Sequence, residues 1–185
     1  MKQKRCFVII DGSNFYFKLK DFKLHYLINF DFSSFIKRLV RKNKFCKAVY
    51  YIGKVRTDKT EKTQKLHAQQ QRLFAHLKKH HVDYSLGYLL KSQGKFHEKG
   101  VDVNIAVDIL VATYENRCDH FILVSSDTDL LPAIKKAKEK GKTIEYIGFS
   151  HSPSLAMIAN CSESTLLKKE DLTPFIAKNS KDSKT

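Results

Sequence analysis

The fold of this chain is set by the stretch Phe121-Ile122-Leu123-Val124-Ser125-Ser126-Asp127-Thr128-Asp129-Leu130-Leu131-Pro132. Four consecutive apolar residues that end at a serine predict a short central strand covered on both faces. The polar residues that follow favour a turn and a helix cap, and Pro132 suits the first turn of a helix that ends at Gly141. Asp127 and Asp129 then lie at the carboxyl end of the strand, where open α/β sheets hold their ligands.

A second apolar run, residues 7–10, also ends in an acid, Asp11. Gly12 and Ser13 follow as a turn before a helical segment, so Asp11 is predicted at the same edge of the sheet as Asp127. Asn14 suits either a helix cap or a hydrogen bond to a neighbouring carboxylate or phosphate. A single aspartate at a helix start is more often a cap than a ligand, so only the convergence of several acids favours a metal or phosphate site.

Strands and helices alternate along the chain, which predicts a three-layer α/β/α sandwich with a mainly parallel central sheet. Residues 91–100 are polar and contain two glycines, so we expect a loop there: either a flexible arm over a site, carrying Lys95, His97 and Lys99, or a plain solvated loop. We expect one domain over residues 1–175 and a polar, disordered tail at residues 176–185. Further strands are expected at 48–52, 82–90 and 143–148, and helices at 32–40, 60–81 and 154–160.

The segment 101–112 is predicted to be a helix that is apolar nearly all round and therefore buried. It carries Asp102 in its first turn and Asp108 inside, and a buried helix keeps acids only when they are paired, hydrogen-bonded or metal-bound. The two side chains are about 240° apart around the helix axis. We expect Asp102 to reach the strand-end site, whereas Asp108 either pairs with a lysine or lies behind the site.

The chain has 185 residues and a net charge of +15, from 34 lysines and arginines against 19 acids. This excess indicates a polyanionic partner, although a lysine-rich adaptation for solubility is the alternative. The densest basic region, residues 37–79, is either a solvated helix surface or a track for a phosphate backbone. The four cysteines form no CxxC pair, and no apolar run is long enough for a signal peptide or a membrane span. We therefore expect a cytoplasmic protein with reduced thiols and no membrane partner.

The four acids Asp11, Asp102, Asp127 and Asp129 suggest a chemistry if they converge. Unneutralised, they would repel one another and raise their own pKa values, and a divalent cation removes that cost. Oxygen ligands without His or Cys suit Mg²⁺ or Mn²⁺ and disfavour zinc. Such a cation near a basic surface suits attack of water on a phosphodiester. Residues that would contact the substrate phosphate are Asn14, Ser125, Ser126 and Lys99.

Three motifs, taken in order, resemble those of the NYN domain, a family also called LabA-like within the PIN-like nuclease superfamily. They are Ile10-Asp11-Gly12-Ser13-Asn14, Lys99-Gly100-Val101-Asp102-Val103 with Asp108, and Ser125-Ser126-Asp127-Thr128-Asp129 with Pro132. The resemblance covers about residues 5–172. It implies a parallel-sheet α/β/α fold and a metal-dependent ribonuclease site at Asp11, Asp102, Asp127 and Asp129, with Asp108 as a further motif position. Many members have glycine where this chain has Ser126, a bulkier residue that narrows the approach of substrate.

Three functional hypotheses follow. The leading one is a ribonuclease that uses Mg²⁺ or Mn²⁺ and acts on RNA. The second is a non-catalytic RNA-binding or regulatory protein, which the basic helices favour. The third is a phosphatase with an aspartyl nucleophile in Asp-x-Asp, but Leu131 stands where such enzymes carry Thr or Val. Assembly into a homo-oligomer is left open by the sequence.

Overall fold

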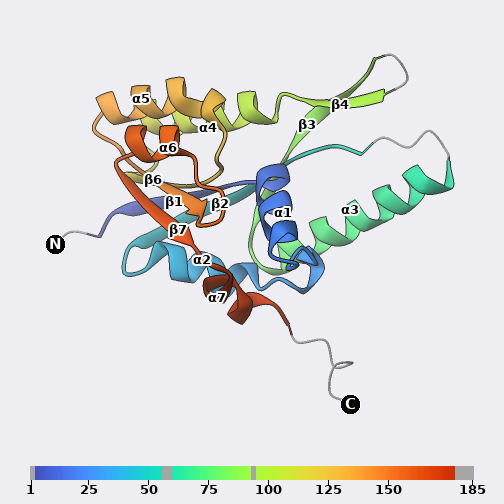
Figure 1. Ribbon diagram of the computed structural model, residues 1–185. Coiled ribbons are helices and arrows are strands. Elements are labelled where there is room, and N and C mark those ends of the chain that lie inside the picture. Colours follow the sequence, from blue (N-terminus) through green and yellow to red (C-terminus); the bar gives the residue numbers. More distant parts are fainter. Residues whose placement is uncertain (1–2, 56–59, 93–94, 178–185) are drawn as a thin grey trace.

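The computed structural model describes residues 3–55, 60–92 and 95–177, which build one sheet with helices on both faces (Figure 1). The strands are β1 (Arg5–Asp11), β2 (Lys44–Gly53), β3 (Asp83–Ser92), β4 (Lys95–Lys99), β5 (His120–Val124), β6 (Thr143–Phe149) and β7 (Glu163–Leu167). Their order across the sheet is β4-β3-β2-β1-β5-β6-β7. All neighbours are parallel except β4, which runs antiparallel to β3. The predicted three-layer α/β/α sandwich with a mainly parallel sheet is confirmed.

The helices divide into two layers. Helices α1 (Gly12–Asp21), α2 (Phe32–Val40), α3 (Glu61–Lys79) and α7 (Lys169–Leu172) cover one face of the sheet. The other face carries α4 (Val101–Tyr114), α5 (Leu131–Glu139) and α6 (Leu155–Asn160), which lie together at the top of Figure 1. The 3₁₀ turns η1 (Leu27–Asn29), η2 (Thr128–Leu130) and η3 (Thr173–Phe175) connect these elements.

The direction of chain travel reverses between β1 and β5. From β1 the chain moves outward through β2 to β3, and from β5 it moves outward the other way through β6 to β7. A parallel sheet opens a crevice at the carboxyl ends of the two strands where this reversal occurs. Ile10 of β1 is in register with Val124 of β5, so the next residues, Asp11 and Ser125, lie side by side at this crevice.

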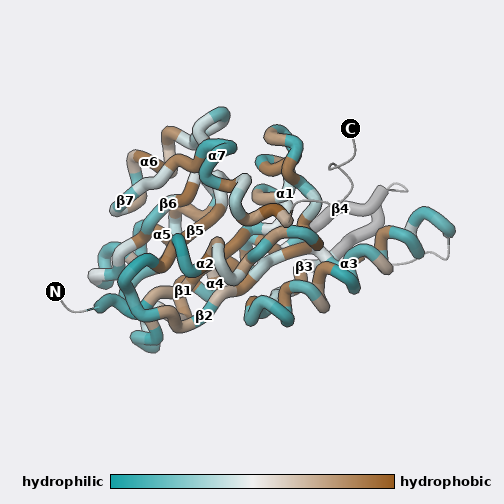
Figure 2. Tube along the Cα trace, turned by 90° about the horizontal axis from the view of Figure 1, so that it is seen from below, coloured by the Kyte–Doolittle hydropathy of each residue, from teal (hydrophilic) through white to brown (hydrophobic). Residues whose placement is uncertain are grey.

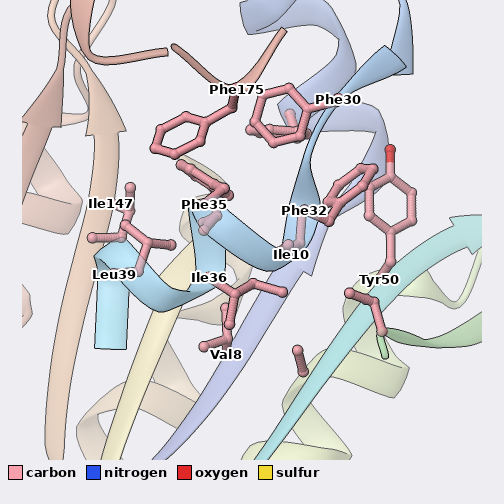
Figure 3. Packing of buried hydrophobic residues seen from close by; sticks show 14 of the residues in the cluster. Val8, Ile10, Phe30, Phe32, Phe35, Ile36, Leu39, Tyr50, Ile147 and Phe175 are labelled. Atoms are coloured by element: carbon pink, nitrogen blue, oxygen red, sulfur yellow. The ribbon is translucent and has the colours of Figure 1, made fainter. Parts of the chain in front are cut away.

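Both faces of the sheet are packed, because alternate residues of β1 enter different cores. Val8 and Ile10 join a phenylalanine-rich core under α1 and α2, whereas Phe7 and Ile9 join the core under α4 and α5. In Figure 3 the rings of Phe30, Phe35 and Phe175 group together in the first core. Figure 2 shows hydrophobic residues concentrated in the strands and hydrophilic residues along much of α3.

Two sequence-based expectations are wrong. The segment expected as a loop continues β3 to Ser92 and forms β4, with Tyr88 paired to Lys99. Backbone hydrogen bonds build such a hairpin without any apolar alternation, so composition concealed it. Helix α4 is not buried all round: Val103 and Val107 are exposed, because only one stripe of a helix can contact a sheet.

The remaining expectations concern the C-terminal tail, the cysteines and membrane-spanning segments. Ile176 forms an isolated bridge with Phe30, and residues 178–185 of the expected tail lie outside the described residues. The four cysteines are free thiols. Within the described part of the chain, no helix combines the length and the apolar character needed to cross a bilayer.

Candidate metal centre

Three carboxylates meet at the crevice between β1 and β5. Asp11 ends β1, Asp127 follows β5, and Asp102 lies in the first turn of α4. Each offers one oxygen, and these oxygens all lie within 4.8 Å of one another. Asp11 is buried and the other two are partly buried, so water screens their mutual repulsion poorly.

Hydrogen bonds hold Asp11 and Asp127 in place. The carboxylate of Asp11 accepts the backbone N–H of Asn14 at 3.0 Å, which caps α1, and the Ser125 hydroxyl at 2.8 Å. The carboxylate of Asp127 accepts the backbone N–H of Asp129 at 2.9 Å, which caps η2. The backbone N–H of Asp127 in turn donates to Ser125 Oγ at 3.1 Å. Both acids are therefore helix caps and members of the cluster at once.

The pKa of Asp102 is raised by its position in this cluster. Burial raises its pKa, and the negative charges of Asp127, Asp11 and Asp129, together with a hydrogen bond to Asp127, raise it further. A hard divalent cation bound by these crowded oxygen ligands would neutralise their mutual repulsion and so favour their ionised form. The donor set, all oxygen and no His or Cys, fits Mg²⁺ or Mn²⁺.

A family model described as the NYN domain matches residues 5–168, a span that contains all three carboxylates. The chain belongs to the NYN domain family. It is similar to an uncharacterized protein of Methanocaldococcus jannaschii, with 42% identity over 57 residues, which is 31% of this chain and 24% of that protein. The match thus spans about a quarter of the length of that curated relative. A crystal structure of a protein of unknown function from Vibrio parahaemolyticus matches with a TM-score of 0.63 and 18% identity, over 89% of this chain and 93% of that one. That likeness concerns the fold alone.

Two acids of the NYN motifs lie outside the group of three. Asp129 is exposed, its backbone N–H donates to the Asp127 carboxylate, and its negative charge helps to raise the pKa of Asp102. Asp108 was expected to pair with a lysine or to lie behind the site; its Oδ2 accepts the hydroxyl of Tyr51 at 2.5 Å. Burial and this hydrogen bond raise the pKa of Tyr51. Spacing along α4 separates Asp108 from Asp102 as expected, but its partner could only be learned from the packing.

The four residues expected to contact phosphate occupy different positions around the acids. Ser125, expected to contact phosphate, is buried, and its hydroxyl joins Asp11 to the Asp127 backbone, so it positions the acids. The hydroxyl of Ser126 lies 2.9 Å from that of Tyr146, and its N–H donates to Asn14 Oδ1 at 3.3 Å. Asn14 and Lys99 line a hollow of about 320 Å³ together with the three carboxylates.

Sequence reasoning missed two side chains around this NYN site. Tyr146 supports Ser126, and its hydroxyl also accepts the N–H of Ser154 at 3.1 Å. Phe17 lines the same hollow as the acids. Neither carries a sequence signal, because a tyrosine inside a strand and a phenylalanine on a helix both resemble ordinary core residues.

A second group with metal-ligand character, His120, Glu145 and Glu163, occurs among the described residues. Here Arg41 already binds both oxygens of Glu145, at 2.8 and 3.3 Å, and the Thr165 hydroxyl donates at 2.8 Å. Burial opposes ionisation of Glu145, yet its contacts with His120, Thr165 and Arg41 keep its pKa below the usual value. A guanidinium in place disfavours another cation, so the strand-end carboxylates are the better metal site.

Proposed function

We propose that this NYN domain is a ribonuclease that hydrolyses RNA phosphodiester bonds with Mg²⁺ or Mn²⁺ held by Asp11, Asp102 and Asp127. The observation that carries the proposal is the close approach of these carboxylates at the sheet crevice, in a chain of this family. The net charge of +15 supports RNA as the partner. We further propose that the domain extends over residues 1–175, and that Asp129 is an outer member of the site.

The residues of the site would share the work as follows. The three carboxylates hold the cation, and Ser125 keeps two of them oriented. When bound, the cation supplies a Lewis acid that polarises the phosphate and lowers the pKa of the attacking water. The exposed Lys99 ammonium, at the rim of the hollow, balances charge on the phosphate oxygens, and the Asn14 side chain orients them.

The test of the proposal is cleavage of a fluorescent RNA by the purified chain. We expect cleavage in Mg²⁺ or Mn²⁺, none in EDTA, and recovery when excess Mn²⁺ is added back. Equal cleavage rates with and without chelator would contradict the proposal. Salt-sensitive RNA binding without cleavage in either metal would favour the alternative, a non-catalytic RNA-binding protein, which the basic charge alone also supports. Family membership leaves the aspartyl-phosphatase hypothesis without support.

Thermal unfolding gives an independent prediction on the metal site. The folded-state pKa of Asp102 is raised, so its contribution to the free energy of unfolding is present at low pH and is lost as pH rises through that pKa. At neutral pH we expect Asp102→Asn to raise the Tm of the metal-free protein by about 2 °C, because it removes like-charge repulsion.

Metal should change the Tm of the wild-type chain but not that of the variant. Mn²⁺ is expected to raise the Tm of the wild-type chain and to leave that of Asp102→Asn nearly unchanged. Differential scanning fluorimetry measures both effects. A metal-induced rise of the same size in both proteins would show that Asp102 does not bind the cation.

A further inference from the structure

An apolar cavity of about 670 Å³ lies between α1, η1 and α3, above β2. Large side chains that would ordinarily be buried face it from three elements: Phe17 of α1, Tyr26 beside η1 and Leu66 of α3. Phe17 and Tyr26 expose 59% and 60% of their surface. Exposed apolar groups gathered around one hollow mark a binding site better than scattered ones do.

The cavity borders the candidate metal centre. Ser13 and Phe17 line both this cavity and the hollow that contains Asp11, Asp102 and Asp127. A chain whose phosphodiester rests at the carboxylates can therefore place a neighbouring unit beside the aromatic wall. This adjacency limits the occupant to something that can extend from the metal centre.

The aromatic wall is arranged for ring stacking. The His25 ring stacks on Tyr26, with centroids 4.9 Å apart and planes at 21°, and it meets Tyr16 edge-on at 5.7 Å. Tyr26 is held on one side and remains exposed, so it offers a preordered surface to a planar ligand. The Nδ1 atom of His25 is buried and finds no hydrogen-bond partner among the described residues.

Positive charge accompanies the aromatic rings. Arg72 of α3 lines the cavity, and the helix carries a single acid, Glu61, in its first turn. Its lysines are Lys62, Lys65, Lys78 and Lys79. Aromatic faces beside a basic helix combine stacking of bases with attraction of phosphates, which is how proteins bind single-stranded nucleic acid.

We propose that this cavity is a nucleobase-binding subsite, which receives an unpaired nucleotide next to the phosphodiester held at the carboxylates, with Tyr26 as the stacking platform. The assignment rests on the proposed ribonuclease function for the identity of the chain that enters. A base inside a duplex is stacked on its neighbours and cannot enter a recessed cavity, so the subsite requires single-stranded RNA at this position.

Fluorescence anisotropy with a labelled single-stranded RNA tests the subsite on the full chain. Measurements in Ca²⁺, which also accepts oxygen ligands, and again in EDTA, with RNA integrity checked on a gel, report binding and not cleavage. We expect Tyr26→Ala to weaken binding about tenfold. The matched control is Tyr114→Ala, since Tyr114 of α4 is also 60% exposed but does not line the cavity. We expect that variant to bind within about twofold of wild type.

An abasic scan of the RNA sharpens the assignment. Removing one base at a time should weaken RNA binding by the wild type most at one position. Removing that same base should weaken binding by Tyr26→Ala very little, because the variant has already lost the contact between the base and the ring. Equal losses in wild type and Tyr26→Ala at every position would overturn the subsite. So would wild-type affinity in Tyr26→Ala, an equal loss in Tyr114→Ala, or no RNA binding by the wild type.

Failure of the subsite and failure of the nuclease proposal can be told apart. Cleavage in Mn²⁺ with unchanged RNA binding by Tyr26→Ala would keep the nuclease and overturn the subsite. Position-specific loss of binding in a protein that never cleaves RNA would keep the subsite and overturn the nuclease.

Discussion

The variant Asp127→Asn is expected to lose RNA cleavage by about 10³-fold or more in kcat/KM, which is about 4 kcal/mol of transition-state stabilisation. The substitution takes one charge from the set of three carboxylates that would hold the cation. It should leave the fold intact, because asparagine caps a helix start about as well as aspartate and can still accept the N–H of Asp129. Initial rates at saturating Mn²⁺, with circular dichroism as the folding check, measure the effect.

Asp108→Asn is the matched control for this prediction. It removes the same negative charge, but from Asp108 on α4. The Asp108 carboxylate accepts the Tyr51 hydroxyl and does not belong to the group of three. We expect its cleavage rate to stay within about threefold of wild type. Retention of cleavage by Asp127→Asn, or an equal loss in Asp108→Asn, would remove the three-carboxylate site from consideration.

Gly12→Ala is expected to destabilise the protein by about 3 kcal/mol, at the upper end of overpacking costs. A Cβ atom at this position would lie 2.4 Å from Cε1 of Tyr50 and 2.6 Å from the carbonyl oxygen of Tyr51. The Tyr50 ring is fully buried and its hydroxyl donates to the Gly12 carbonyl at 3.1 Å, so neither neighbour can yield without moving α1 off the sheet. Because Asp11 precedes Gly12, cleavage should fall as well. Urea unfolding and the RNA assay measure the two effects.

Gly141→Ala is a control for glycine replacement in general. Gly141 has a φ of +76° but no atom within 4 Å of an added Cβ, so only the backbone conformation is strained. We expect a cost of about 1 kcal/mol and full cleavage activity. A larger loss of stability in Gly141→Ala than in Gly12→Ala would show that contact with β2 is not the reason for glycine at position 12.

The sequence by itself determined the fold class and two of the three clustered acids. The runs 7–10 and 121–124 are apolar and end in polar residues, and such local patterns encode buried parallel strands without help from distant residues. Since the carboxyl ends of parallel strands share one edge, Asp11 and Asp127 could be placed together from the pattern alone. The approach of Asp102 followed from a weaker argument, the cost of an acid on an apolar helix.

Only the tertiary structure decided which neighbouring polar residues face the cluster. Asp127 and Asp129 are two residues apart in one motif, yet the η2 turn brings the first to the cluster and leaves the second exposed. Ser125 is buried between two acids, and Asp108 is bound by Tyr51. These outcomes depend on how the helices pack against the sheet. That packing is decided by side chains from segments far apart in the chain, and local periodicity does not encode it.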